Sequence, residues 1–330
     1  MARLINILKY LAPAALILIQ CNTTPASEVI DPSKIFKGHD SWVNDISAYN
    51  NTLYSVSNDG SLIEWDLKSG KIRNRIFLDK VKMLVREVVP HIYTISINKA
   101  GKLYGITSSD GYLRIRERSS HEELWKYKIE MENAYSLAFV NDHALLIGDI
   151  SGTVTGVDIK KKKALYEIHA HVDAINEISL APDGKSFATV SNDSLIRIWE
   201  SSTGKRIKTI KGHKDSILSV DFSPDGTMLL TGSRDRTVRL WDVEEGDATL
   251  LHNDFSYINE VAFSPDGKRV AYQDNINNVT IKSVDTDKIL YRLEGHEANV
   301  KKILFLGGAE KIITCSSDSN IIIWNTGGSK

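Results

Sequence analysis

The sequence has little cysteine and no excess of either charge. Its 330 residues include two cysteines, Cys21 and Cys315, which are too few for a disulfide framework. Lysine and arginine total 41 against 42 for aspartate and glutamate, so there is no basic surplus to attract nucleic acid and no acidic bias towards disorder. With 42% hydrophobic and 25% charged residues, we expect a large folded body and no nucleic-acid partner.

Long apolar runs are also lacking, apart from one segment near the N-terminus. Two basic residues, Arg3 and Lys9, come before an apolar run over residues 11–19. A spanning helix needs about 20 apolar residues, so this shorter run is typical of an export signal. We therefore predict a signal peptide over residues 1–20. The polar, proline-containing stretch that follows predicts a flexible tether over residues 21–33.

Residues 18–21, Leu-Ile-Gln-Cys, resemble the lipobox of bacterial lipoproteins, in which a signal peptidase cleaves before the cysteine. Gln20 departs from that pattern, which usually has Gly, Ala or Ser there. The resemblance implies lipid attachment at Cys21 and a membrane-anchored location in the bacterial cell envelope, on the periplasmic or the surface side. A simple secretory signal and an uncleaved anchor are the alternatives.

The rest of the chain is built from seven repeated frames, each with a short turn followed by a strand. The residues that end this strand are Trp65, Arg116, Val157, Trp199, Trp241, Lys282 and Trp324, at spacings of 51, 41, 42, 42, 41 and 42 residues. A period of ~40–45 residues with strand patterning is typical of propellers with one four-stranded blade per repeat. We therefore predict an all-β fold over residues 34–326, a seven-bladed β-propeller with four-stranded antiparallel blades.

Ring closure is also predicted. The last frame has three strands, and residues 33–39 align with residues 207–213, which form an outer strand followed by Gly-His. We expect the N-terminal strand to close the last blade, the usual way in which a propeller avoids an open edge.

Four frames combine a histidine, a turn aspartate and a terminal tryptophan. The sets are His39, Asp59, Trp65; His171, Asp193, Trp199; His213, Asp235, Trp241; and His296, Asp318, Trp324. They resemble the signature of the WD-repeat (WD40) family, and the resemblance covers residues 34–325. It implies that each set forms a structural, hydrogen-bonded tetrad with a strand hydroxyl. The hydroxyl lies four residues before the aspartate (Ser55, Thr189, Thr231, Thr314) or two before it (Ser57, Ser191, Ser233, Ser316).

Catalytic and metal-binding motifs are not found. There is no nucleophile elbow, phosphate loop, dinucleotide fingerprint or zinc-protease helix. His169 and His171 are too few for a zinc site, and the oxygen-rich residues 274–278 lie in a turn, where such residues are common. We identify no ring of acidic residues or histidines on the inner strands, and we predict a protein with no catalytic residues, no cofactor and no metal.

The WD-repeat resemblance implies that a protein or peptide partner binds the face that carries the His and Asp loops. Residues expected on that face are Trp42, His91, Tyr257, Arg234, Asn58, Asn192 and Asn299. Tryptophan, tyrosine and arginine are the types that most often dominate interfaces. The 51-residue spacing adds an apolar and basic insertion at residues 80–90, which either contributes to recognition or packs on the rim.

These features predict an exported, lipid-anchored and monomeric interaction scaffold without catalytic activity. Two alternatives remain. The protein is an envelope assembly factor that resembles the eight-bladed propeller lipoprotein of the outer-membrane barrel-assembly machinery, or it is a propeller hydrolase.

Overall fold

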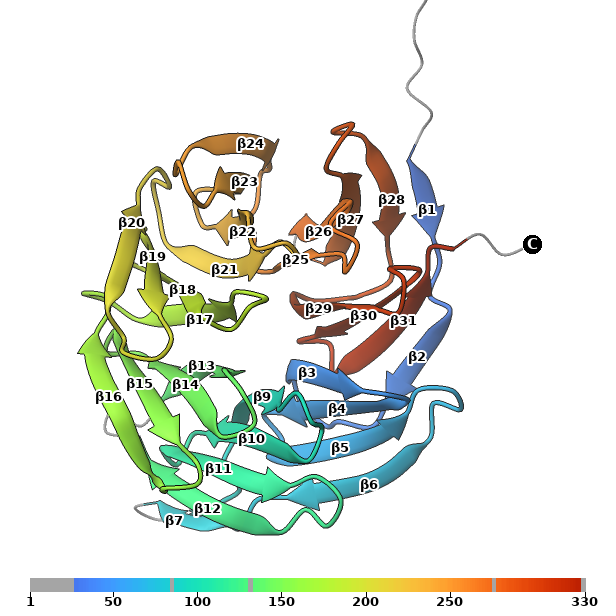
Figure 1. Cartoon of the computed structure of the whole chain (residues 1–330). Helices are drawn as coiled ribbons and strands as arrows, with labels where there is room; N and C mark the ends of the chain where they lie inside the picture. Colours follow the sequence, from blue (N-terminus) through green and yellow to red (C-terminus); the bar gives the residue numbers. More distant parts are fainter. Residues whose placement is uncertain (1–26, 84–85, 130–132, 275–276, 328–330) are drawn as a thin grey trace, which may run out of the picture.

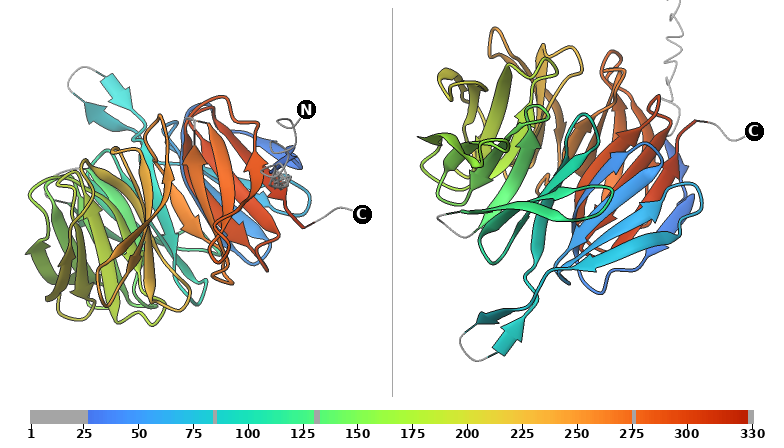
Figure 2. Two further views of the ribbon diagram at one scale, coloured as in Figure 1. Left: turned by 90° about the horizontal axis from the view of Figure 1, so that it is seen from above. Right: turned by 60° about the horizontal axis from the view of Figure 1, so that its bottom comes forward.

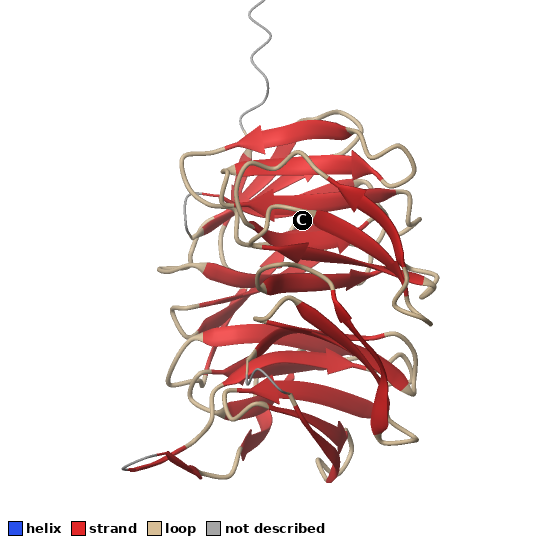
Figure 3. Ribbon diagram, turned by 90° about the vertical axis from the view of Figure 1, so that its left-hand side faces the viewer, coloured by secondary structure: helices blue, strands red, loops and turns tan. Residues whose placement is uncertain are grey.

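Seven β-sheets are arranged in a ring in the computed structural model (Figure 1). The structure describes residues 27–83, 86–129, 133–274 and 277–327. Every helix or strand defined in this part of the chain is a β-strand, as Figure 3 shows by colour. The predicted all-β, seven-bladed propeller is confirmed.

Each blade runs from an inner strand near the ring axis to an outer strand at the rim. Blades one to three are β3 (Val43–Tyr49), β4 (Thr52–Ser57), β5 (Ser61–Asp66) and β6 (Ile72–Phe77); β9 (Ile92–Ile97), β10 (Leu103–Ser108), β11 (Tyr112–Glu117) and β12 (Glu123–Lys128); and β13 (Ala134–Phe139), β14 (Ala144–Asp149), β15 (Thr153–Asp158) and β16 (Lys163–His169). Blades four and five are β17 (Ile175–Leu180), β18 (Ser186–Ser191), β19 (Ile196–Glu200) and β20 (Arg206–Ile210); and β21 (Ile217–Phe222), β22 (Met228–Ser233), β23 (Thr237–Asp242) and β24 (Ala248–Asn253). Blade six is β25 (Val261–Phe263), β26 (Arg269–Asp274), β27 (Asn278–Ser283) and β28 (Ile289–Leu293), and blade seven has β29 (Val300–Leu306), β30 (Lys311–Ser316) and β31 (Asn320–Asn325).

The ring is closed by a strand from the N-terminal side of the body. Strand β2 (Lys34–Lys37) pairs antiparallel with β31 and supplies the fourth strand of blade seven. In this register Phe36 lies opposite Ile321, and both side chains are buried. The predicted closure is therefore confirmed, and the first and last parts of the propeller are held in one sheet.

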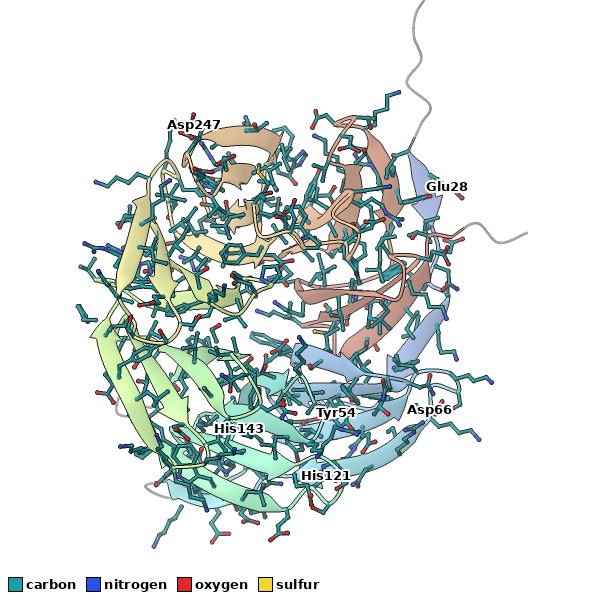
Figure 4. The ribbon with its side chains drawn as sticks, viewed as in Figure 1. Glu28, Tyr54, Asp66, His121, His143 and Asp247 are labelled. Carbon is teal, nitrogen blue, oxygen red and sulfur yellow. The ribbon has the colours of Figure 1, made fainter. Side chains whose placement is uncertain are left out.

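The predicted tether over residues 21–33 needs a correction. Its residues 28–30 form strand β1 (Glu28–Ile30), which pairs in parallel with β28 and gives blade six a fifth strand. Figure 4 labels Glu28 at the outer edge of that blade. The segment Glu-Val-Ile is short, but Val and Ile favour strands, and the outer edge of β28 has free backbone groups that can pair with it.

The core lies in the seams between blades. The largest fully buried side chains include Trp65, Trp241 and Trp324, each on the third strand of its blade. The seam between blades one and two uses tyrosines instead, since the rings of Tyr54 and Tyr104 stack with centroids 6.3 Å apart (Tyr54 is labelled in Figure 4). Large flat side chains fill the wedge between twisted sheets, as close packing of the interior requires.

The insertion predicted at residues 80–90 forms a hairpin that stands away from the ring (Figure 2). Strands β7 (Val81–Met83) and β8 (Arg86–Val88) pair antiparallel. The hairpin begins and ends at the turn of blade one, where Leu78 N donates to Gly60 O and Val89 packs against Gly60. Gly60 has φ +78°, and a Cβ there would lie 2.2 Å from Val89, so this position requires glycine.

Candidate functional site

The loops that carry the histidines and turn aspartates lie on one face of the ring, and four tetrads hold them in place. In blade five His213 Nδ1 is 2.8 Å from Asp235 Oδ2, and His213 Nε2 is 2.7 Å from Thr231 Oγ1. Trp241 Nε1 donates to the same Thr231 hydroxyl at 2.8 Å. This buried chain of hydrogen bonds joins the loop of His213 and the turn of Asp235 to strands β22 and β23.

The same bonds recur in blades one, four and seven. The Trp Nε1 to hydroxyl distances are 2.8 Å for Trp65 to Ser55, 2.9 Å for Trp199 to Thr189 and 2.9 Å for Trp324 to Thr314. The matching histidine pairs are His39 with Asp59 at 3.1 Å, His171 with Asp193 at 2.9 Å and His296 with Asp318 at 2.7 Å. The tetrad hydroxyl is therefore the one four residues before the aspartate.

The competing hydroxyls have a different structural role. Those two residues before the aspartate donate to a carbonyl of the preceding loop: Ser57 to Ser41, Ser191 to Asp173, Ser233 to Asp215 and Ser316 to Ala298, at 3.0–3.2 Å. They also accept from the backbone N–H of the turn aspartate, as in Asp235 N to Ser233 Oγ at 3.0 Å. Both loops on this face are thus fixed to each other before any partner binds.

In blades four and five the electrostatics of the tetrad favour a neutral histidine beside an ionised aspartate. Burial lowers the pKa of His171 and of His213, although the nearby aspartates oppose this. Burial by itself would raise the pKa of Asp235, but hydrogen bonds from His213 and Thr237 hold that pKa well below its usual range. These histidines are buried and fully engaged, so they cannot act on a ligand.

The three frames without a tetrad have other contacts in its place. In blade two the Arg114 guanidinium bonds to Asp110, with Nη1 3.0 Å from Oδ1. In blade six Lys282 occupies the tryptophan position, donates to Leu251 O and pairs with Asp287 Oδ1 at 2.6 Å. In blade three Val157 occupies the same position and is completely buried. Blade two thus has an ion pair within the blade, blade three has an apolar side chain, and the lysine of blade six reaches a carbonyl of blade five.

A hollow of about 520 Å³ opens at the mouth of the central channel on this face. It brings together the predicted residues Trp42, Asn58 and His91. The Trp42 side chain is 51% exposed, and Lys301 Nζ lies 5.6 Å from the centre of its ring. Sequence reasoning missed Tyr135, which lines the same hollow and is partly exposed.

Charged residues of the channel also line this hollow, so the expectation of no acidic ring on the inner strands is wrong in part. Asp45, Glu177 and Lys302 occupy equivalent positions on the inner strands β3, β17 and β29 of blades one, four and seven. Glu260 has the matching position in blade six, directly before β25. Lys302 Nζ bonds to Glu177 and lies 2.9 Å from Glu260 Oε1. Burial raises the pKa of Glu260, and the positive charge of Lys302 opposes this.

These channel side chains connect one blade to the next. Asp45 accepts from the backbone N–H of Ile95 at 3.0 Å, and Glu177 accepts from that of Val220 at 2.8 Å. Each of these acceptor–donor pairs joins neighbouring inner strands. The carboxylates therefore satisfy buried backbone donors, which is a structural use of charge.

A second hollow, of about 500 Å³, lies beside the channel mouth between blades five and six. It contains the predicted residues Arg234, Tyr257 and Asn299, and Asn259 lines both hollows. Tyr257 is 53% exposed, and the Arg234 guanidinium lies 5.9 Å from its ring centre. The structure thus divides the predicted face into two neighbouring sites.

Asn192 lines neither hollow. Its Oδ1 accepts from Asn176 Nδ2 at 3.0 Å, and Asn176 also donates to Ile217 O of the next blade. Asn58 has the same arrangement, since it accepts from Asn44 at 2.7 Å while Asn44 donates to Ile92 O. Asn58 and Asn192 thus each accept a hydrogen bond from an asparagine that also bonds to the next blade, so both have a structural role apart from any contact with a partner.

Several other features fall outside this face or outside the described residues. Cys315 is a free, buried thiol in β30. No cluster of three or more His, Cys, Asp or Glu able to hold a metal is found among the residues that the structure describes. The predicted signal peptide and Cys21 lie outside the described residues, as do residues 275–276 of the oxygen-rich turn. Within residues 27–83, 86–129, 133–274 and 277–327, no helix is long and apolar enough to cross a membrane.

Comparison with known proteins identifies four of the repeats. Residues 30–66, 162–200, 204–242 and 287–325 match the model of the family "WD domain, G-beta repeat". Each matched segment holds one of the four tetrads described above. The blades whose sequences lack the tetrad are those that the family model does not match.

Curated relatives resemble parts or most of the chain. A guanine nucleotide-binding protein subunit beta-like protein of Encephalitozoon cuniculi is 29% identical over 280 residues, which is 83% of this chain and 76% of that protein. Eukaryotic translation initiation factor 3 subunit I of Bombyx mori is 27% identical over 161 residues, 44% of this chain and 46% of that protein. The WD repeat-containing protein SL1-17 of Schistosoma mansoni is 26% identical over 164 residues, 49% and 51% of the two chains. The chain thus spans about half the length of the last two relatives.

Proposed function

We propose that this WD40-repeat, seven-bladed β-propeller is a non-catalytic scaffold that binds a protein or peptide partner across the face carrying the His and Asp loops. WD40 propellers typically act in protein interaction, and four repeats of this chain match the WD40 family model. The observation that supports this face is the exposure of large aromatic side chains on a rigid surface. Trp42 and Tyr257 are about half exposed, although hydrogen bonds fix both loops: Ser57 Oγ donates to Ser41 O, and Ile258 N donates to Ser233 O. Rigid exposed aromatics cost little ordering entropy when a partner covers them.

The carboxylates of the channel do not favour a hydrolase. Asp45 and Glu177 accept hydrogen bonds from backbone N–H groups of neighbouring blades, and Lys302 compensates Glu177 and Glu260. Their oxygens are therefore used in joining blades. The seven blades and four tetrads likewise favour a WD40 scaffold over the eight-bladed barrel-assembly lipoprotein.

The experiment replaces one exposed residue in each hollow. Trp42→Ala together with Arg234→Ala should abolish capture of the partner in photo-crosslinking and pulldown from membranes, with an unchanged melting temperature. A matched control, Phe77→Ala with Arg206→Ala, removes an exposed aromatic and an arginine from the outer strands β6 and β20. Capture that persists in the first double variant would refute this face as the binding site.

We also propose that the protein is exported and held at a membrane of the bacterial cell envelope by lipid on Cys21. The basis is the sequence of residues 1–21, with its short apolar run before Leu-Ile-Gln-Cys. Cys21→Ala should move the protein from the membrane fraction to the soluble fraction and abolish incorporation of labelled palmitate. If Cys21→Ala remains in the membrane fraction and the wild type incorporates no palmitate, the lipid anchor is excluded.

A further inference from the structure

The hollow between blades five and six has an unusual combination of side chains. Among the described residues, its lining has two arginines, two aromatic residues, four neutral polar residues and no aspartate or glutamate: Arg234, Arg236, Phe255, Ser256, Tyr257, Asn259, Gln273 and Asn299. Phe255 is 91% exposed, the most exposed large hydrophobic side chain in the described residues. A largely exposed phenylalanine in the same hollow as two arginines favours a ligand with both apolar and anionic groups.

No carboxylate of the described residues forms an ion pair with either arginine of this hollow. Within the described residues neither Arg234 nor Arg236 forms an ion pair, and the contact found for Arg234 is the ring of Tyr257. Asp235 lies between them in sequence, but both of its oxygens are occupied. Oδ2 binds His213 and the backbone N–H of Lys214, and Oδ1 accepts from Thr237.

The neighbouring acidic residue is also engaged elsewhere. Asp254 precedes Phe255, and its Oδ1 accepts the Phe255 backbone N–H at 2.5 Å, while Oδ2 lies 3.6 Å from His252 Nε2. This cap fixes the loop that presents Phe255 and Tyr257. The Ser256 hydroxyl, between these two aromatics, is shielded from solvent and has no hydrogen-bond partner among the described residues. The tetrad and this cap therefore leave a positive, aromatic hollow with unused hydrogen-bonding capacity.

From this geometry we infer that the hollow between blades five and six binds an acidic peptide segment in which a carboxylate adjoins an aromatic or large apolar side chain. The carboxylate pairs with Arg234 and Arg236, whose planar guanidinium groups match its geometry. The apolar side chain packs against Phe255 and Tyr257. A volume of about 500 Å³ accommodates a few side chains of a peptide. This inference rests on the proposed scaffold function and specifies the chemistry of its partner.

The test measures fluorescence anisotropy of a fluorescein-labelled peptide, Gly-Asp-Glu-Phe-Glu-Asp-Gly, added to the full chain. Arg234→Gln with Arg236→Gln should weaken binding by about tenfold or more, since each variant removes charge-assisted hydrogen bonds. The control Lys205→Gln with Arg206→Gln removes the same net charge from two exposed positions, the residue before β20 and its first residue, and should leave the affinity unchanged. Equal losses in the two double variants would show general charge attraction and overturn the site.

A second pair of variants tests the aromatic part. Phe255→Ser should weaken binding of this peptide several-fold and have little effect on a peptide with glycine in place of phenylalanine. Phe77→Ser, at an exposed phenylalanine of β6, is the matched control and should leave both affinities unchanged. An equal effect of Phe255→Ser on both peptides would exclude the proposed aromatic contact.

Two further outcomes are decisive. If a phosphoserine peptide binds more than about tenfold tighter than the carboxylate peptide, the hollow is a phosphate site and the carboxylate assignment fails. If no acidic peptide binds while capture still depends on Trp42 and Arg234, this inference fails and the proposed scaffold function stands. If no acidic peptide binds and capture does not depend on Trp42 and Arg234, the proposed function fails as well.

Discussion

At the scale of single residues, the four tryptophans of the tetrads combine two stabilising roles. Trp241 is buried, it packs against Gly212, and its Nε1 donates to Thr231. A smaller side chain would leave a cavity and also an unused hydroxyl lone pair inside the blade. The contribution of Trp241 to stability therefore depends both on the volume of its ring and on the hydrogen bond of its Nε1.

We expect Trp241→Ala to lower the free energy of unfolding by about 3–5 kcal/mol, as truncation of a large buried aromatic does. The measurement is urea unfolding followed by circular dichroism. Trp42→Ala is the control, because Trp42 is half exposed and its loss should cost less than ~1 kcal/mol. Similar costs at the two positions would contradict a structural role specific to the tetrad.

The sequence predicts the His, Asp and Trp of each tetrad but does not identify the hydroxyl. Both Thr231 and Ser233 point to the same side of β22, because side chains alternate along a strand. Only the distances separate them, since Trp241 reaches Thr231 whereas Ser233 reaches the loop carbonyl of Asp215. Likewise, the asparagine pair of Asn44 and Asn58 depends on a neighbouring blade, which no local pattern reveals.

At the scale of the strands, polar side chains on the inner strands hold adjacent blades together. Asp221 of β21 accepts the backbone N–H of Phe263 in β25 at 2.8 Å, and Ser179 of β17 accepts that of Phe222. The partners of Asp221 lie about 42 residues away in sequence, one repeat along the chain. Because each partner lies one repeat away in the sequence, no local pattern predicts that the acidic residues of the channel bond to neighbouring blades.

The buried carboxyl of Asp221 predicts a specific dependence of stability on pH. Burial raises its pKa from 3.8 to about 6, so the folded state keeps a proton that the unfolded state releases between these values. Stability should therefore fall as pH rises from about 4 to 6, by at most about 3 kcal/mol from this group. Asp221→Asn keeps an acceptor for Phe263 N–H and removes the titration, so its stability should fall less over that range.

The measurement compares the free energy of unfolding of the two proteins in urea at pH 4, 5, 6 and 7. Asp225→Asn is the control, and its change in stability between pH 4 and 6 should match that of the wild type. Hydrogen bonds from Ser223 and Thr227 lower the pKa of Asp225, so its contribution is present above pH 3.8 and is lost as pH falls. If Asp221→Asn and the wild type have the same slope between pH 4 and 6, the carboxyl does not titrate in this window.

At the scale of the whole molecule, the N-terminal strands join two blades. Strand β2 completes blade seven, and β1 adds an outer strand to blade six, so a short segment spans the last two sheets of the ring. The sequence predicts β2 because residues 33–39 align with the outer strand of another repeat. It does not predict β1, because that strand lies outside the repeat and pairs in parallel with β28.

The two strands should contribute very differently to stability. Deletion of residues 33–37 removes β2 and the buried Phe36, leaves the edge of β31 unpaired and should lower the melting temperature by roughly 10 °C or more. Deletion of residues 28–30 removes β1, whose side chains are largely exposed, and should lower the melting temperature by only a few degrees. Differential scanning calorimetry of the two deletions beside the full chain measures this difference. An unchanged melting temperature after loss of residues 33–37 would show that the ring does not need its closing strand, and a larger loss from residues 28–30 would assign closure to blade six instead.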